Sequence, residues 1–567
     1  MRFYSRAIAG VAIASLMLTV TGASTRAIQQ DDVGERPLAR APRAMVAASN
    51  PRSTEAALEI LRKGGNAVDA AIAASLVAMV VEPNMVAFGG FGSLIAYDAA
   101  SRQSRFMTFW MQYPQAFNPD AKAGPGAYVI APGAPKGLHQ AATKYGKLPF
   151  SEIVGPAIRI AREGFPIYGS LYGQMFERYG FLTATEEGRA TWTREGFLPA
   201  PGSIFRQPAL AETLHQYARQ GPDYIYNGPF AKKLVDTVQR YGGRLTHADL
   251  RDYQALESEP GRSTYRDVEI RSSWPPDSGG LGLALAMNIL EALDLRKSGP
   301  YTSSIDSAYY VYATLRTVQE MVGFVRDPGV YNVPAELLLS KEFAARQAQR
   351  IRDAKTLAGR SGRKGAPPTE TVQGREDRAV APSPETGTVH ISVVDEAGNA
   401  CGITSSIAGD TFGQSGLVVD GVLINGSGRF RPAGSHDSRW SSLAAPSLLF
   451  RDGQLLGVIG SPSDVYSTMT QVLVNLVDFG MDPQAAVSAP RMYARRATFI
   501  DTDAAYLLET RFDPKVLAGL KALNASVDAR GAYANPAGAA RVVIRDRATG
   551  QLLGGTDPRR PGLAKGY

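Results

Sequence analysis

The chain has 567 residues, of which 44% are hydrophobic and 20% charged, so it is long enough to bury a large core. Its net charge is +8, but the basic residues are dispersed without interleaved aromatic residues, which argues against a nucleic-acid partner. Five histidines without an HExxH motif or paired Cys/His spacing argue against catalytic zinc, and the single cysteine, Cys401, excludes an internal disulfide.

Residues 1–27 have the pattern of an export signal. Arg2 and Arg6 precede an apolar run at residues 7–20, and small residues follow at 21–24. The run is too short for a comfortable transmembrane span, and no later stretch is long and apolar enough for one. We therefore expect a periplasmic or secreted protein with no stable membrane insertion after signal removal. An uncleaved signal anchor is the alternative.

Helical and strand patterns alternate irregularly along the rest of the chain. Helices are predicted at residues 54–81, with a break at 63–66, and at 137–145, 149–163, 209–220, 228–241, 281–293, 305–325, 341–355 and 465–479. Strands are predicted at residues 93–97, 104–110, 268–274, 388–395, 400–407, 421–425, 447–450, 455–459 and 540–545, and a turn at 554–559. This order favours a layered α+β sandwich over a doubly wound sheet.

Thr388 opens a β-branched run directly after a polar segment. Residues 355–387 contain hardly any large apolar side chain and are expected to form a mobile tether. A threonine at the head of a buried strand, behind a cleavable tether, suits an N-terminal nucleophile. Cleavage of the Gly387–Thr388 bond leaves the hydroxyl beside an α-amine with a pKa of about 8, which can act as its base. An ordinary edge strand after a disordered loop is the alternative interpretation.

Several motifs, in order, resemble the γ-glutamyltranspeptidase family of N-terminal nucleophile hydrolases. They are GGNAVDAA at 64–71, SGG at 278–280 before NILE at 288–291, the Thr388 run with GNA at 398–400, GSP at 460–462, and DPR at 557–559 with a terminal Gly-Tyr. The resemblance extends from about residue 44 to the last residue. It implies a four-layer αββα sandwich formed jointly by a large subunit, residues 28–387, and a small subunit, residues 388–567, both cut from one precursor.

The resemblance also implies acyl transfer from a small amide or peptide by Thr388, without a metal or organic cofactor. Ser406 matches the second hydroxyl residue that hydrogen-bonds the nucleophile in the family; a serine that only satisfies its own strand is the alternative. Ser442, or Ser441 beside it, matches one of two serines that line the acyl site. Residues 463 and 464 match a Gly-Gly pair whose backbone N–H groups form an oxyanion hole.

That last pair is a departure from the family, because it is Ser463 and Asp464 here. Their backbone amides can still donate from a helix N-terminus. The carboxylate of Asp464 would repel an oxyanion if it pointed inward, so we expect it to cap the helix that follows instead.

Further departures concern the substrate's charged groups. Trp110 stands where the family has an arginine for the α-carboxylate of a γ-glutamyl group. Ala408 or Gly409, and the segment from Ser427 to Phe430, stand where it has an asparagine and an acidic residue for the α-amine. A buried charge without its partner costs about 3–5 kcal/mol. We therefore expect an open, less polar site and an acyl group other than a standard γ-glutamyl.

Two alternatives remain open at this point. Asp410, Arg429 and Arg431 would supply the missing charges from shifted positions in a glutathione hydrolase with a rearranged pocket. A non-catalytic, unprocessed relative that acts as a scaffold or peptide-binding protein is the alternative of another class. The intact Thr388 and its tether argue against the second alternative, whereas the changed oxyanion pair and the missing charged residues argue for it.

Overall fold

The structure is a computed structural model. It describes residues 35–118, 124–361, 387–409, 411–430, 438–494, 506–529, 531–533 and 538–567. The expected export signal and residues 362–386 of the expected tether lie outside these ranges. Within them, no helix combines the length and the apolar character needed to cross a bilayer.

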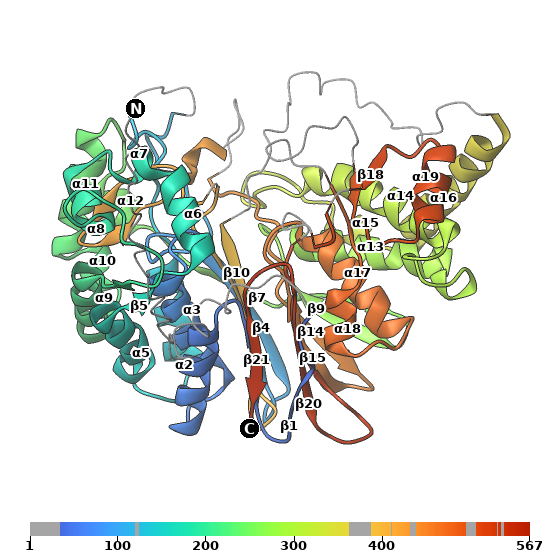
Figure 1. Cartoon of the computed structure of the whole chain (residues 1–567), viewed down its shortest axis with the longest axis horizontal. Helices are drawn as coiled ribbons and strands as arrows, with labels where there is room; N and C mark the ends of the chain where they lie inside the picture. The colour runs from blue at the N-terminus through green and yellow to red at the C-terminus, as the bar shows by residue number, and fades with distance from the viewer. Residues whose placement is uncertain are drawn as a thin grey trace, which may run out of the picture.

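Two antiparallel seven-stranded sheets lie face to face at the centre of the molecule (Figure 1). The first sheet has the order β21 (Leu563–Gly566), β2 (Met45–Ala48), β10 (Thr388–Val394), β11 (Ala400–Ser406), β3 (Phe91–Asp98), β4 (Gln103–Thr108) and β7 (Leu256–Ser258). The second has the order β1 (Ala39–Ala41), β20 (Leu552–Thr556), β19 (Arg541–Arg545), β15 (Gln454–Gly460), β14 (Ser447–Arg451), β9 (Val268–Ser272) and β8 (Gly261–Tyr265).

A layer of helices covers the outer face of each sheet, which gives the four-layer αββα sandwich that the sequence predicted (Figure 1). The first layer holds α2 (Pro51–Arg62), α3 (Ala67–Val81), α4 (Ala134–Tyr145), α5 (Phe150–Glu163), α6 (Gly169–Glu177), α7 (Tyr179–Leu182), α8 (Glu186–Trp192), α9 (Pro208–Gln220), α10 (Asp223–Tyr226), α11 (Pro229–Arg240) and α12 (His247–Arg251). The second holds α13 (Gly279–Leu293), α14 (Ile305–Met321), α15 (Ala335–Leu339), α16 (Lys341–Ser361), α17 (Val465–Val477), α18 (Pro483–Ser488) and α19 (Pro514–Ala522).

The other strands and the 3-10 turns of the described residues are short. They are the strand pairs β5 (Phe165–Pro166) with β6 (Ile204–Phe205) and β12 (Val418–Val419) with β13 (Val422–Leu423), the three-stranded sheet of β16 (Met492–Ala494), β17 (Tyr506–Leu508) and β18 (Val527–Ala529), and the 3-10 turns η2 (Leu295–Lys297), η3 (Val322–Phe324) and η4 (Ser427–Phe430).

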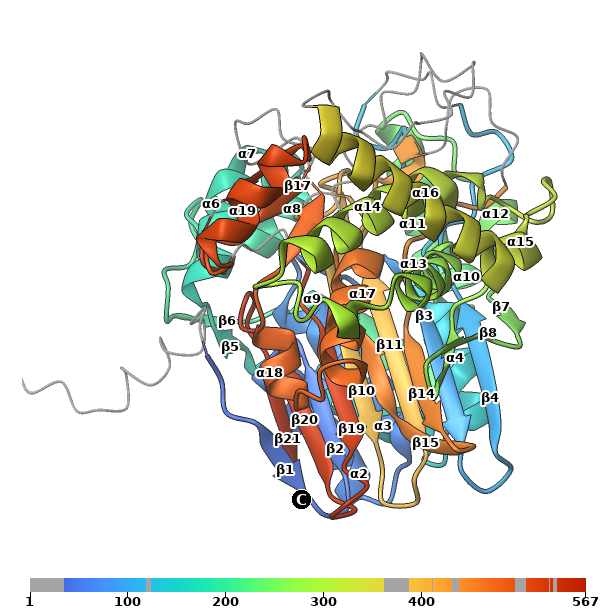
Figure 2. The ribbon, with the colours of Figure 1, turned by 90° about the vertical axis from the view of Figure 1, so that its right-hand side faces the viewer.

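Strands β10 and β11 lie in the interior of the first sheet (Figure 2). Every residue of both strands is buried. On one side they pack against α3, whose fifteen residues are all buried because its alanine-rich surface lets it lie close to the sheet. On the other side they face β15 and β19 of the second sheet. The first residue of β10 is therefore held from several directions.

Two local predictions are wrong. Helix α16 continues to Ser361, so the start of the expected tether at residue 355 is helical. Residues 554–556 belong to β20 and do not form a turn. The glycines there serve packing: a side chain at Gly555 would lie 2.6 Å from the carbonyl oxygen of Pro483, and one at Gly554 would lie 2.8 Å from the sulfur of Met45.

Candidate active site

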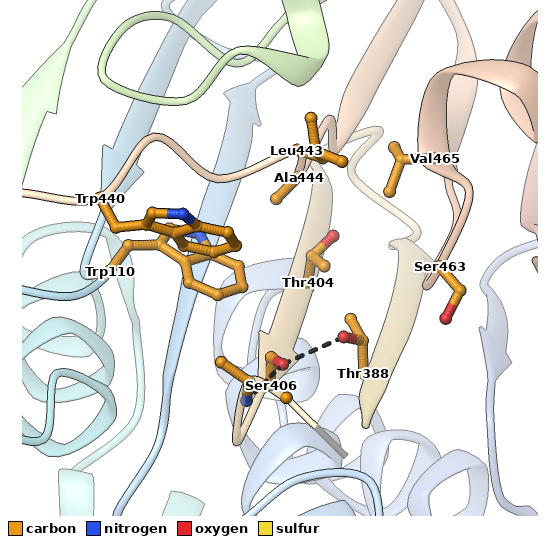
Figure 3. Close-up of a pocket in the computed structure, with 11 residues that line it drawn as sticks. Trp110, Thr388, Thr404, Ser406, Trp440, Leu443, Ala444, Ser463 and Val465 are labelled. Atoms are coloured by element: carbon orange, nitrogen blue, oxygen red, sulfur yellow. Dashed lines mark hydrogen bonds between the residues drawn. The ribbon is translucent and has the colours of Figure 1, made fainter. Parts of the chain in front are cut away.

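Thr388 is the first residue of β10, directly after Gly387, and is only 6% exposed. Antiparallel pairing places it opposite Ser406, the last residue of β11. The hydroxyl of Thr388 donates a hydrogen bond to Oγ of Ser406 at 3.0 Å (Figure 3). Two strands of one hairpin thus hold the two hydroxyl groups that the sequence singled out side by side.

The hydroxyl of Ser406 in turn donates to the carbonyl oxygen of Gly387 at 2.5 Å and accepts from the backbone N–H of Ala408 at 2.8 Å. Ala408 has a positive φ of 50°, so the chain turns sharply after β11 and brings this N–H back over Ser406. Ser406 therefore links the hydroxyl of Thr388 to the carbonyl of the peptide bond that precedes it. This geometry suits proton transfer during attack on that carbonyl.

A pocket of about 350 Å³, counting the space at its mouth, lies against these two residues. Its lining consists of Trp110, Thr388, Thr404, Ser406, Ala408, Gly409, Trp440, Leu443, Ala444, Ser463 and Val465 (Figure 3). None of these side chains carries a charge. The wall is formed mainly by two indole rings and four aliphatic side chains, with hydroxyl groups clustered at the nucleophile.

The two indole rings belong to Trp110 and Trp440, whose centroids are 5.5 Å apart in an edge-to-face arrangement. Trp440 lies on a short segment that runs antiparallel to residues 111–113. Oδ2 of the buried Asp327 accepts hydrogen bonds from the N–H and hydroxyl of Ser438 at 2.9 and 2.6 Å, and from the N–H of Arg439 at 3.0 Å. Asp327 thereby fixes the segment that places Trp440 in the pocket.

Ser463 and Asp464 lie where β15 gives way to α17, and both have left-handed backbone conformations, with φ of 48° and 36°. Ser463 lines the pocket. The prediction that Asp464 caps α17 is wrong, because its side chain makes no capping hydrogen bond. A residue that caps a helix through its side chain typically has an extended backbone, whereas Asp464 is left-handed with φ of 36°.

The other predicted substrate residues are not part of the pocket lining. Ser442 is buried and donates to Oδ1 of Asp277 at 2.7 Å, and burial raises the pKa of Asp277 well above its usual range. Ser427 donates to the carbonyl oxygen of Ile407 at 3.2 Å. Ser441 is not among the lining residues either.

The remaining predicted substrate residues lie partly or wholly outside the described part of the structure. Phe430 ends η4, but its side chain and that of Arg429 lie outside the described part of the structure, as do Asp410 and Arg431 altogether.

His390 on β10 contacts the pocket residue Thr404 through a hydrogen bond. Desolvation of the fully buried ring lowers its pKa to about 3, so it is neutral at physiological pH. The hydroxyl of Ser392 donates to the carbonyl oxygen of Arg541, so this hydroxyl accepts from Nε2–H of His390 at 3.1 Å. Nδ1 then accepts from the hydroxyl of Thr404 at 2.9 Å, which orients that pocket residue.

Sequence reasoning missed five lining residues: Thr404, Trp440, Leu443, Ala444 and Val465. A signal was present for Thr404, because it lies two residues before Ser406 on the same strand and so shares its face. Trp440 has no comparable signal, since Asp327, which fixes its segment, is more than a hundred residues away in the sequence.

An αββα sandwich with a threonine at the head of an inner strand defines an N-terminal nucleophile amidohydrolase or acyltransferase. The particular family follows from the sequence: the profile of the gamma-glutamyltranspeptidase family matches residues 53–567. The chain therefore belongs to the γ-glutamyltranspeptidase family.

Relatives within the family differ in the activity that their names state. The glutathione hydrolase proenzyme of Escherichia coli (strain K12) is 29% identical, over 93% of this chain and 92% of that protein. The glutathione hydrolase proenzyme of Bacillus subtilis (strain 168) is 30% identical, over 79% and 80%. The acylase ACY 1 proenzyme of Pseudomonas sp. (strain SE83) is 29% identical, over 81% and 84%.

The fold is shared with a cephalosporin acylase from Bacillus halodurans, whose crystal structure matches with a TM-score of 0.79 at 24% identity. The match covers 94% of this chain and 97% of that one.

Proposed function

We propose that this protein is an exported enzyme that cuts itself before Thr388 and then uses Thr388 to transfer an acyl group from an amide to water or an amine. The observation that carries the proposal is the position of the Ser406 hydroxyl, which accepts from Thr388 and donates to the carbonyl of Gly387. An ordinary strand start has no need for such an arrangement around its first peptide bond. The names of the relatives, which describe proenzymes, agree with self-cleavage.

Self-cleavage begins with attack of Oγ1 of Thr388 on the carbonyl carbon of Gly387. The new C–O bond replaces the C–N bond, the hydroxyl proton passes to the departing nitrogen, and the resulting ester joins Gly387 to the side chain of Thr388. Ser406 donates to the oxygen on which negative charge develops and accepts from the attacking hydroxyl. Water then hydrolyses the ester, which leaves a large subunit ending at Gly387 and a small subunit with a free α-amine at Thr388.

The mature enzyme repeats the chemistry on a substrate. The α-amine of Thr388 takes the proton of its own hydroxyl, and Oγ1 attacks the substrate's amide carbon. The amine product leaves with that proton, and water or a second amine resolves the acyl-enzyme. We assign the oxyanion contacts to the backbone amides of Ser463 and Asp464, since Ser463 borders the pocket at the N-terminal end of α17.

The acyl group is proposed to be uncharged and apolar at its far end, and flat enough to lie against Trp110 and Trp440. The zwitterionic head of a γ-glutamyl group would meet no charged side chain in the described lining. The loss of such a partner costs about 3–5 kcal/mol, whereas an apolar acyl group gains from burial against indole rings.

The substrate class is tested with anilides that carry γ-glutamyl, glutaryl, β-aspartyl, butyryl or phenylacetyl groups. We expect kcat/KM to be highest for phenylacetyl and at least about 100-fold lower for γ-glutamyl. A Thr388→Ala variant should stay uncut and inactive on every anilide. A clear preference for L-γ-glutamyl overturns the proposed pocket chemistry and favours a glutathione hydrolase.

Export is supported by the basic residues and apolar run at the N-terminus alone. Cell fractionation, with N-terminal sequencing of the large subunit, tests it. The expected start lies between Ser24 and Gln30, and a cytoplasmic large subunit that retains Met1 contradicts export.

A further inference from the structure

Arg560 places a positive charge beside the nucleophile. Its side chain is 8% exposed, and Nη2 donates to Oγ of Ser463 at 3.0 Å. Nη1 lies 3.4 Å from the carbonyl oxygen of Thr388, a long hydrogen bond. One guanidinium thus contacts both the residue that carries the nucleophile and the pocket residue on its other side.

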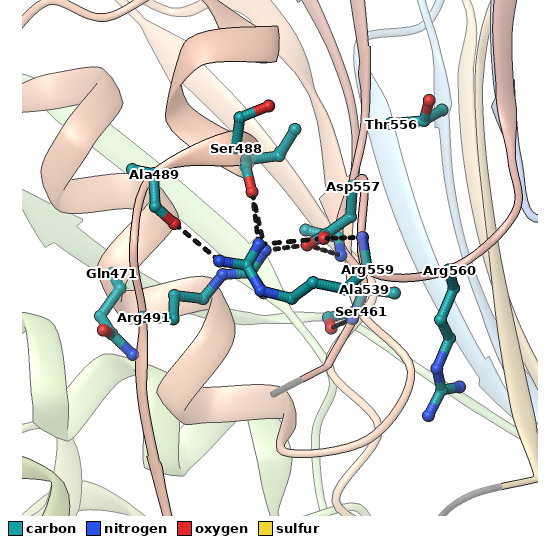
Figure 4. A network of polar contacts seen from close by, with 12 residues as sticks. Ser461, Gln471, Ser488, Ala489, Arg491, Ala539, Thr556, Asp557, Arg559 and Arg560 are labelled. Atoms are coloured by element: carbon teal, nitrogen blue, oxygen red, sulfur yellow. Dashed lines mark hydrogen bonds and ion pairs between the residues drawn. The ribbon is translucent and has the colours of Figure 1, made fainter. Parts of the chain in front are cut away.

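The loop after β20 holds Arg560 in this direction. The neighbouring Arg559 points the other way, into a buried network where it binds Asp557 and Glu509, and Asp557 also pairs with Arg491 (Figure 4). The backbone of the loop is fixed as well, because Arg36 donates to the carbonyl oxygens of Arg560 and Gly562 at 3.0 and 2.5 Å. The position of the Arg560 charge therefore follows from the fold.

Cleavage would create an ammonium group on the same residue whose carbonyl contacts Arg560. A like charge within roughly 4–6 Å disfavours protonation and lowers the pKa of an amine by about 1–3 units. A lower pKa increases the fraction of the amine that is neutral near pH 7 and able to accept the hydroxyl proton.

Other titratable groups also lie around this end of β10. Burial raises the pKa of Glu82, at the end of α3, to about 7, so its carboxyl is largely neutral in more acidic solution. His390 on β10 is neutral, and Arg541 at the start of β19 has a pKa lowered to about 9 and adds a second positive charge. Asp464, beside Ser463 at the start of α17, is the acidic group on the remaining side.

We propose that Arg560 is a positioning residue that holds Thr388 and Ser463 in register, and that its charge keeps the α-amine of Thr388 neutral enough to act as the base. This inference rests on the proposed function, because the amine exists only after self-cleavage. It accounts for a base that works near neutral pH without a histidine in contact with the nucleophile.

The test measures the amine directly and needs no knowledge of the substrate. Cyanate reacts with neutral amines, so its rate of addition to Thr388, followed by mass spectrometry of the small subunit's first peptide across pH, reports the pKa of that amine. Arg560→Gln removes the charge but keeps hydrogen-bond donors, whereas Arg560→Lys keeps the charge. Lys565→Met is the matched control, since it removes an exposed cation from the same C-terminal segment.

In Arg560→Gln we expect the pKa of the amine to rise by roughly one unit and labelling at pH 6.5 to slow about 3- to 10-fold. Arg560→Lys and Lys565→Met should label like the unaltered protein, and adding Glu82→Gln to Arg560→Gln should leave most of the shift in place. Unchanged labelling in Arg560→Gln overturns the proposal.

Self-cleavage of each variant is followed on a gel, and folding is checked by thermal unfolding. Because the amine exists only in cut protein, labelling is compared for the cut fraction of each variant. A cut Arg560→Lys whose amine labels as slowly as that of Arg560→Gln refutes the role of the charge. A Thr388→Ala variant that is cut and active would instead refute the proposed function itself, so the two failures can be told apart.

Discussion

Replacement of Ser406 by alanine is expected to slow self-cleavage severely. The structure gives this hydroxyl two contacts with reacting atoms: it accepts from Oγ1 of Thr388 at 3.0 Å and donates to the carbonyl oxygen of Gly387 at 2.5 Å. Loss of one donor to a developing oxyanion typically slows acyl transfer about 100- to 1000-fold. Because Ser406→Ala also removes the acceptor of the attacking hydroxyl, we expect at least a 100-fold slower cleavage.

The variant should still fold. The backbone N–H of Ala408 loses its acceptor, which costs about 1–3 kcal/mol for a buried group. That loss lowers the thermal unfolding temperature by a few degrees in a protein of this size. Slow cleavage can therefore be separated from misfolding by recording the unfolding curve of the uncut chain.

The assay is cell-free synthesis of the full chain, with the uncut and cut products followed on a gel over time. Ser406→Thr keeps the hydroxyl and should cleave at a rate close to that of the unaltered protein. Ser405→Ala is the matched control, because Ser405 lies on the same strand but its hydroxyl contacts Ser75 of α3 instead. Cleavage of Ser406→Ala within about threefold of the unaltered rate would show that Ser406 does not assist the reaction.

Three further predictions concern specificity and stability. Trp110→Arg introduces a cation into the pocket wall. It should raise kcat/KM for γ-glutamyl anilide about 10-fold or more and lower kcat/KM for phenylacetyl anilide. A loss of kcat/KM for both substrates would contradict the proposed acyl site. Asp327→Ala frees the segment that carries Trp440 and should raise KM for phenylacetyl anilide about 10-fold with a smaller effect on kcat. Asp327→Asn should have an intermediate KM. An unchanged KM in Asp327→Ala would show that the segment keeps its position without Asp327. Glu82 binds its proton more tightly in the folded than in the unfolded state, so its burial costs stability increasingly as pH rises from about 4.5 to 7. The free energy of unfolding of Glu82→Gln should exceed that of the parent by on the order of 3 kcal/mol above pH 7 and equal it near pH 4. A difference independent of pH would refute the claim that ionisation of buried Glu82 causes it.

Local sequence signals were sufficient for the parts of the structure that depend on neighbouring residues. The Thr388 hairpin followed from β-branched runs around a turn, and the break between α2 and α3 followed from the two glycines at residues 64 and 65. The contact of Thr388 with Ser406 was expected from the resemblance to the family, and the register of that hairpin produces it.

Features set by distant residues were not accessible in this way. Asp464 looked like a helix cap, but the left-handed turn between β15 and α17 depends on how those elements pack. The glycines at residues 554 and 555 looked like a turn, but they let β20 lie against β2 and α18. Contact between Arg560 and Thr388 spans 172 residues, so no local pattern indicates it.

The most direct test of the account is the intact mass and N-terminal sequence of the purified protein. We predict two fragments that stay associated, the smaller beginning Thr388-Val389-His390, and a single full-length chain for Thr388→Ala. A folded but uncut chain in the unaltered protein, or a cut at another bond, would contradict the claim that Thr388 is an N-terminal nucleophile.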